Sequence, residues 1–223
     1  MFDEIWPVVV VSLKVALCST LLAVTSAVML GQVFAAGRSK LMKALEIMVY
    51  LPLALPPVAL GFGLLIIFGH NGIVGSLLHR FGIDVAFSFL GAVLASFAVS
   101  LGIGVRTMKT AFLGIDLQQR QVAMLMGARS WQIFLFIILP QCKGALLTTI
   151  ILSFIRALSE FGATMVLAGN VLGSTRTLAL AIWVDMETPG KEGECYLLVF
   201  IAMIIAVIAI VLSEIVIKKW EMK

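Results

Sequence analysis

Five long apolar blocks constrain the fold of this chain more than any other feature of its 223 residues. A helix needs about 20 apolar residues to cross the hydrocarbon core of a bilayer. Each block is long enough for one crossing. The pattern therefore predicts an all-α membrane protein with about five transmembrane helices. The blocks run at about Pro7–Phe34, Ile47–Phe68, Ala86–Val105, Ala145–Leu167 and Tyr196–Ile217.

The composition agrees with this class. Hydrophobic residues make up 61% of the chain and charged residues 13%, whereas a soluble domain has about 45–50% apolar and about 25% charged residues. We therefore expect a single transmembrane domain over residues 1–223, surrounded by membrane lipid. The net charge of +4 could indicate nucleic acid, but cytoplasmic loop bias explains it in a membrane protein, so we expect no nucleic-acid partner.

Lysine and arginine are distributed unequally between the two sides of the predicted bundle. If the N-terminus lies outside, eleven of the 16 fall in inner loops and the C-terminal tail, and three fall in outer loops. The other two, Lys14 and Arg156, lie within predicted helices. Positive charge concentrates on the cytoplasmic side of membrane proteins. The asymmetry predicts an outer N-terminus, an inner C-terminus and a cytoplasmic loop at about 106–143.

This loop is predicted to contain two short helices with a break between them. Asp116 is the predicted N-cap, with Gln119 three residues later as its capping-box partner. The first helix would then run over about 117–126. Gly127 follows where a left-handed residue commonly ends a helix, and Ser130 can cap the second helix.

The loop resembles the cytoplasmic EAA loop of ABC-importer permeases. That family pattern reads Glu-Ala-Ala, three residues, Gly, nine residues and Ile-x-Leu-Pro, and its final proline disrupts backbone pairing. Gln121 stands here in place of the glutamate and Val122 in place of the first alanine. The resemblance implies that the loop docks into a groove of a separate ATP-hydrolysing subunit. The residues at matching positions are Ala123, Gly127, Ile137, Leu139 and Pro140.

Two apolar blocks contain residues that are unusual at membrane depth. The second carries Pro52, Pro56 and Pro57, which predict a broken helix facing the bundle interior, because backbone groups freed there must be satisfied. The fourth carries Arg156, with Glu160 four residues later on the same helix face. A charge at the bilayer centre costs at least about 2.5–3.5 kcal/mol, so this pair should face a cavity or a partner. A purely structural ion pair is the alternative. The residues predicted to line a translocation path are Pro56, Pro57, Arg156, Ser159 and Glu160.

Several segments resemble permeases for molybdate, tungstate and sulfate. They are Arg156-Ala-Leu-Ser-Glu-Phe-Gly-Ala163, LPLALPP at 51–57 and Gly173-Ser-Thr-Arg-Thr177. The short chain is more like the molybdate group. The resemblance implies a type I ABC-importer permease fold and a homodimer that lines one pathway. It also implies two ABC ATPase subunits that bind ATP and Mg, and an extracytoplasmic oxyanion-binding protein that contacts Thr175 and Arg176.

The function implied by these resemblances is import of molybdate, or tungstate, across the inner membrane of a prokaryote. A sulfate or thiosulfate permease remains the alternative. From another class, a secondary anion transporter would also suit an intramembrane Arg–Glu pair, although no internal repeat is evident. The chain contains no G-x-x-x-x-G-K-[ST] pattern. We therefore expect no catalytic site and no bound cofactor in this chain, with ATP hydrolysis in a partner subunit.

Cysteine and histidine usage predicts neither a disulfide nor a metal site. The three cysteines form no spaced pair. The two histidines, His70 and His79, flank a short loop and have no partner at ligand spacing. The surrounding segment of residues 69–84 contains His-Asn-Gly, a turn signal, and is predicted to be an external hairpin.

Overall fold

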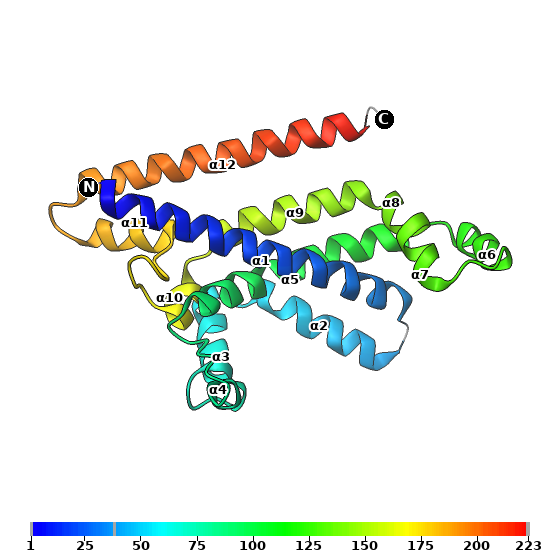
Figure 1. The fold of residues 1–223 in the computed structure, drawn as a ribbon, viewed down its shortest axis with the longest axis horizontal. Helices are drawn as coiled ribbons and strands as arrows, with labels where there is room; N and C mark the ends of the chain where they lie inside the picture. Colours follow the sequence, from blue (N-terminus) through cyan, green and yellow to red (C-terminus); the bar gives the residue numbers. More distant parts are fainter. Residues whose placement is uncertain (1, 38, 222–223) are drawn as a thin grey trace.

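The chain forms a bundle of helices in the computed structural model, which describes residues 2–37 and 39–221. In chain order the helices over these residues are α1 (Phe2–Ala36), α2 (Lys40–Ala54), α3 (Pro57–Phe68), α4 (Ile73–His79), α5 (Phe89–Leu113), α6 (Leu117–Leu125), α7 (Ser130–Ile133), the π-helix η1 (Phe134–Ile138), α8 (Leu139–Gln141), α9 (Lys143–Leu158), α10 (Gly162–Ala168), α11 (Leu178–Glu187) and α12 (Glu192–Glu221). Helices α1, α5 and α9 pack together along the long axis and form the centre (Figure 1).

Small residues allow these three central helices to approach closely. A Cβ atom placed on Gly104 of α5 would lie 3.0 Å from the Ala27 Cβ of α1 and 3.0 Å from the Thr149 Cγ2 of α9. Ala92, Ala95 and several other small residues of α5 are buried. Close backbone approach supplies the packing that holds helices together in lipid, where apolar surface gives no driving force.

Three helical segments among the described residues are long and apolar enough to cross a membrane, and two bent helix pairs raise the number to five. The predicted all-α membrane fold is therefore confirmed. The three segments are Ile5–Ala36, Phe89–Leu113 and Glu192–Leu212. The two pairs are Pro57–Phe68 with Ile73–His79, bent by 51°, and Ser130–Gln141 with Lys143–Leu158, bent by 73°.

Two of the predicted blocks are broken in the structure. The second is interrupted after Ala54, where Leu55 has extended backbone and Pro56 precedes the next helix. This confirms the break predicted from the prolines. The fourth stops at Leu158 and resumes at Gly162. The prediction of one continuous helix over Ala145–Leu167 is therefore wrong.

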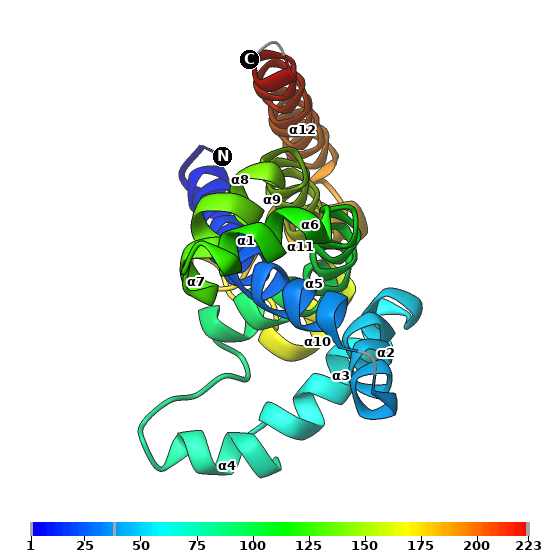
Figure 2. The same ribbon diagram turned by 90° about the vertical axis from the view of Figure 1, so that its right-hand side faces the viewer.

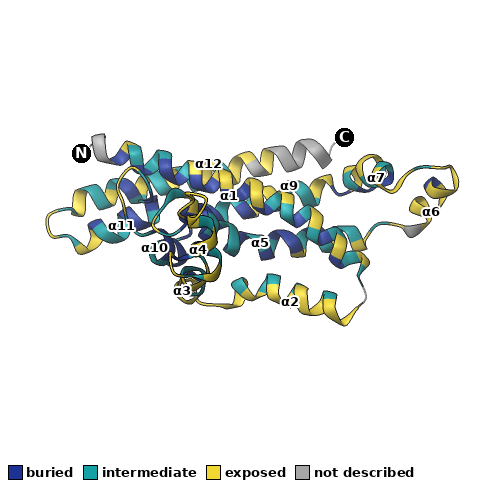
Figure 3. Cartoon of the chain, turned by 60° about the horizontal axis from the view of Figure 1, so that its bottom comes forward, coloured by how far each residue is buried: buried dark blue, intermediate teal, exposed yellow. Residues whose placement is uncertain are grey.

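Helices α2, α3 and α4 lie along one side of the bundle (Figure 2), where α2 packs on α5 and α3 on α10. The structure describes every residue of α2 and assigns none of them to the buried class. Most of this helix is coloured as exposed in Figure 3. An ion pair between Glu46 and Lys109 of α5, both partly buried, ties α2 to the bundle. The chain itself therefore covers only part of the apolar surface of α2.

Candidate functional site

Two helix breaks from distant parts of the sequence lie against each other. A Cβ atom on Gly162, at the start of α10, would lie 3.0 Å from the Cβ of Pro57, at the start of α3. One turn further along α3, a Cβ atom on Gly61 would lie 2.8 Å from both the Cα and the carbonyl oxygen of Ala163. Only glycine permits such an approach. The break that follows α2 therefore adjoins the break that precedes α10.

The carboxylate of Glu160 lies in the second break and interacts with the end of α9 and with the start of α10. Its Oε2 atom lies 2.8 Å from Nη1 of Arg156, in the last turn of α9. Its Oε1 atom accepts a 2.8 Å hydrogen bond from the backbone N–H of Ala163, in the first turn of α10. Negative charge at a helix N-terminus and positive charge at a C-terminus complement the two helix dipoles. The predicted ion pair is present, but the placement of both residues on one continuous helix is wrong.

The two charged side chains of this site differ in their exposure to solvent. The Glu160 side chain is 1% exposed, whereas that of Arg156 is 29% exposed. Pro56, Pro57 and Ser159 are exposed around them. The guanidinium has five N–H donors, and the ion pair engages one of its ends. The remaining donors are free to bind a further acceptor, while the buried carboxylate balances part of the positive charge.

The loop between α10 and α11 contains the two residues that were predicted to contact a binding protein. Thr175 is fully buried, and its hydroxyl donates to the Gly169 carbonyl at 3.2 Å and accepts from the Val171 N–H at 2.9 Å. Thr175 therefore supports the loop from inside, which corrects its predicted position at the surface. Arg176 is partly exposed, and its Nε donates to Oδ1 of Asn170 at 2.8 Å.

The start of the two-helix loop agrees with the sequence in part. Helix α6 begins at Leu117, and Oδ1 of Asp116 accepts the Gln118 N–H at 2.8 Å, which confirms the predicted N-cap. The predicted capping box is wrong, because the side chain of Gln119 bonds to another helix instead of to Asp116. Its Oε1 accepts a hydrogen bond from the side-chain amide of Gln141 at 2.8 Å, which connects α6 to α8.

The turn between the two short helices depends on Gly127. Its φ angle of 85° is left-handed, as predicted, and its N–H donates to the Met124 carbonyl. The second helix begins at Ser130, with Arg129 in the N-cap position. The side-chain oxygen of Gln132 accepts the Arg129 N–H at 2.8 Å. The prediction that Ser130 is the cap is therefore wrong by one residue.

The far end of the loop contains a π-helix and then a proline. In η1 the N–H of Leu139 reaches back to the carbonyl of Phe134. Pro140 follows, has no N–H to donate and precedes the 73° bend into α9. This confirms the predicted disruption of backbone pairing. Single π turns inside helices are frequent at functional sites.

A small apolar core fixes α6 against α7, and an apolar surface lies around it. Ala123, Ile133 and Ile138 form this core, with Ile137 packed against it. Helices α6 and α7 lie at one end of the molecule and α11 at the other (Figure 1). A contiguous exposed apolar surface indicates a site of protein contact. The exposed side chains on these helices include Gln121, Val122, Met124, Leu125, Met126 and Trp131.

The two histidines have a partner that the sequence interpretation missed. Nδ1 of His79 lies 2.8 Å from Oδ1 of Asp84, so the prediction that the histidines lack one is wrong. His79 ends α4, and Asp84 lies in the connection that follows. The two residues are five positions apart, which places them on the same face of neither a helix nor a strand, so periodicity does not predict the contact. The one sequence signal for it is a polar residue shortly beyond a helix end, where the chain reverses.

Known proteins resemble the chain in both sequence and fold. Residues 23–220 match the family described as binding-protein-dependent transport system inner membrane component. The chain is 35% identical over 213 residues to the molybdenum transport system permease protein ModB of Haemophilus influenzae, covering 95% of this chain and 93% of that protein. It is 37% identical over 187 residues to the putative molybdenum transport system permease protein YvgM of Bacillus subtilis, covering 83% and 82%. A bacterial ABC transporter involved in alginate import matches the fold with a TM-score of 0.73 at 18% identity, covering 96% of this chain and 78% of that one.

Proposed function

We propose, from the premise that this chain belongs to the family of binding-protein-dependent transport system inner membrane components, that it is the membrane permease subunit of an ATP-driven molybdate importer. The observation that carries this proposal is the likeness to a molybdenum permease over 95% of the chain. The chain is a multi-pass membrane protein with the fold of an ABC-importer permease. Its role is to form the anion path and to couple that path to ATP hydrolysis elsewhere.

In this proposal two copies of the chain line one path, and two ATPase subunits bind ATP and Mg beneath them. The exposed apolar side chains of α6, Leu125 and Met126 among them, supply the docking surface. The small core around Ile133 packs α6 against α7, and the hydrogen bond between Gln119 and Gln141 ties α6 to α8, which supports movement of these helices as one unit. Closure of the ATPase pair would move this unit and shift the bundle between inward-open and outward-open states.

Arg156 supplies the cationic point on the proposed path, together with Pro56, Pro57 and Ser159. Its partial exposure supports this role, since a fully buried guanidinium could not meet an anion. The hydrogen-bonded position of Glu160 supports a different task, which is to hold the guanidinium and the start of α10 in place. Because Glu160 balances part of its charge, the Arg156 guanidinium attracts a dianion but does not bind it so tightly that the dianion cannot leave. On the outer side, Arg176 remains the proposed contact for an oxyanion-binding protein.

The direct test is anion uptake into vesicles that contain the permease, its ATPase and its binding protein. We expect uptake of molybdate that requires both ATP and the binding protein, with tungstate and sulfate as competitors in parallel. Sulfate as the preferred anion would move the assignment to the sulfate group. Uptake that follows a proton gradient without ATP would instead support a secondary anion transporter and contradict the proposed coupling.

The charge distribution predicts that the N-terminus lies outside and the C-terminus in the cytoplasm. A reporter fused after Lys223, which lies outside the described residues, tests this orientation. We expect activity from a reporter that works only in the cytoplasm, and silence from alkaline phosphatase, which needs the oxidising outer compartment. Phosphatase activity at this fusion would place α6 on the wrong side of the membrane for an ATPase.

A further inference from the structure

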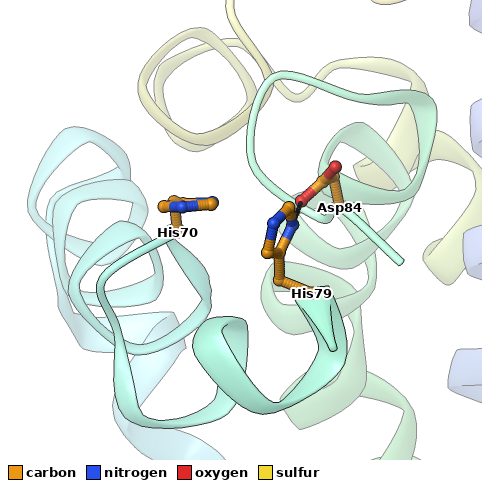
Figure 4. A group of neighbouring side chains, drawn as sticks. All are labelled: His70, His79 and Asp84. Carbon is orange, nitrogen blue, oxygen red and sulfur yellow. Dashed lines mark hydrogen bonds and ion pairs between the residues drawn. The ribbon is translucent and has the colours of Figure 1, made fainter. Parts of the chain in front are cut away.

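The two histidines of the chain and one carboxylate converge beside the exposed end of α3. His70 follows α3, His79 ends α4, and Asp84 lies in the connection to α5 (Figure 4). His79 and Asp84 are in contact at 2.8 Å between Nδ1 and Oδ1. The two imidazole rings lie edge to face, with centroids 4.2 Å apart. One ligand atom from each of the three side chains lies within 4.8 Å of the other two.

The backbone of residues 69–88, which we call the α4 arm, places these side chains together. A Cβ atom on Gly75 would lie 1.9 Å from the carbonyl oxygen of Gly69, and one on Gly72 would lie 2.4 Å from the Ile66 carbonyl oxygen. No side chain fits at either glycine, so α4 folds back tightly on the end of α3. The other end of the arm is fixed to α10, because the Phe87 N–H donates to the Leu167 carbonyl at 2.9 Å.

An ion pair alone does not account for this arrangement. His79 and Asp84 would suffice for a surface pair, and such exposed pairs contribute about 0–1 kcal/mol. The tight turn also brings the second histidine of the chain against the first. Two imidazoles and a carboxylate are a ligand set that transition-metal ions prefer, whereas Mg²⁺ and Ca²⁺ prefer oxygen ligands alone.

We propose that His70, His79 and Asp84 form a binding site for a divalent transition-metal ion, with Zn²⁺ as the occupant. Zn²⁺ takes imidazole nitrogen and carboxylate oxygen at about 2.0–2.2 Å. Two such donors at a tetrahedral angle lie about 3.4 Å apart on those bond lengths. The His79 Nδ1 and Asp84 Oδ1 atoms, 2.8 Å apart and hydrogen-bonded, are closer than that spacing, so an ion that takes both atoms must displace the proton they share and part them slightly. His70, whose ligand atom lies within 4.8 Å of the other two and whose side chain is exposed, would turn to complete the set, with water as the fourth ligand.

A bound ion would join the end of α3, the end of α4 and the approach to α5. The α4 arm would then be closed by a cross-link between its beginning and its later part, in addition to its backbone contacts. The site depends on neither the transported anion nor the ATPase. It can therefore be tested on the purified permease, and its failure would leave the proposed transport function untouched.

The first experiment is isothermal titration of the full-length permease with Zn²⁺, in detergent and without a histidine tag. We expect one Zn²⁺ per chain. The variants His70→Ala and His79→Ala should lose this binding, and Asp84→Asn should weaken it by at least about tenfold. Glu187→Gln, which removes an exposed carboxylate at the end of α11, is the matched control and should bind as the wild type does. Unchanged binding by the double variant His70→Ala, His79→Ala would overturn the site, and so would a wild type that binds no Zn²⁺.

The second experiment measures the cross-link rather than the affinity. Arg80 is exposed between His79 and Asp84, so trypsin can report on the α4 arm. Zn²⁺ should slow cleavage after Arg80 in the wild type and in Glu187→Gln, and leave the rate unchanged in His70→Ala. Far-ultraviolet circular dichroism of each variant establishes that it is folded. Equal protection of the wild type and of His70→Ala would contradict a bridge through His70.

Discussion

Uptake is lost when Arg156 is replaced by glutamine: this is the largest effect we expect from a single change in the membrane part of the chain. The substitution leaves Glu160, whose side chain is 1% exposed, buried without its cation, which is destabilising. It also removes the proposed cationic point of the path. Arg156→Lys keeps the charge but loses the planar fork of donors, so it should retain only part of the uptake. The measurement is oxyanion-stimulated uptake in reconstituted vesicles.

The double variant Arg156→Gln, Glu160→Gln separates the path role from a purely structural one. It removes both charges together, and the glutamine oxygen at 160 can still accept the Ala163 N–H. We expect this variant to assemble normally and to remain inactive in uptake. Lys14→Gln, which removes an exposed cation from α1, is the control and should transport normally. Near-normal uptake by the double variant would leave Arg156 as a packing residue only.

Gly127→Val should leave the permease in the membrane but uncouple it from ATP. The φ angle of 85° lies in the left-handed region, and holding a residue other than glycine there costs about 1–2 kcal/mol. A β-branched side chain resists this conformation most. A Cβ atom at this position would meet no described atom within 4 Å. The expected defect is therefore a change of turn geometry between α6 and α7 and not a clash.

Gly127→Asn is the matched variant, because asparagine tolerates the left-handed region far better than valine does. We expect the asparagine variant to keep much of its ATPase co-purification and uptake, and the valine variant to lose both. Equal, normal behaviour of the two variants would show that the turn does not set the docking surface. If both variants lost uptake equally, the cause would be a clash between the added side chain and the ATPase, and not the backbone conformation at residue 127.

The sequence predicts those features that depend on local chemistry. The length of the apolar blocks predicts membrane helices, Asp116 predicts the start of α6, and Gly127 predicts its left-handed end. Pro56 and Pro57 predict the break before α3. In each case one residue type favours one backbone state, whatever the rest of the chain does.

Features that depend on the meeting of distant segments could not be predicted in this way. Residues 159–161 contain neither proline nor glycine, and a carboxylate that caps the start of α10, as Glu160 does, is not a signal that by itself predicts the end of α9. Only the packing of Gly162 and Ala163 against α3 shows why the chain must turn. The burial of Thr175 and the meeting of the two histidines likewise follow from chain reversals that local spacing does not reveal.

The exposure of α2 bears on how long a newly made copy of this chain survives. Leu41, Ile47 and Met48 of this helix are each more than 60% exposed in the single chain, although its other face packs on the bundle and is paired with α5 through Glu46 and Lys109. In the single chain much of this helix is uncovered by other protein, which leaves it open to the chaperones and proteases that remove incompletely folded chains. If the second copy of the proposed assembly covers α2, a shortage of copies would lower the amount of the chain that survives in the cell.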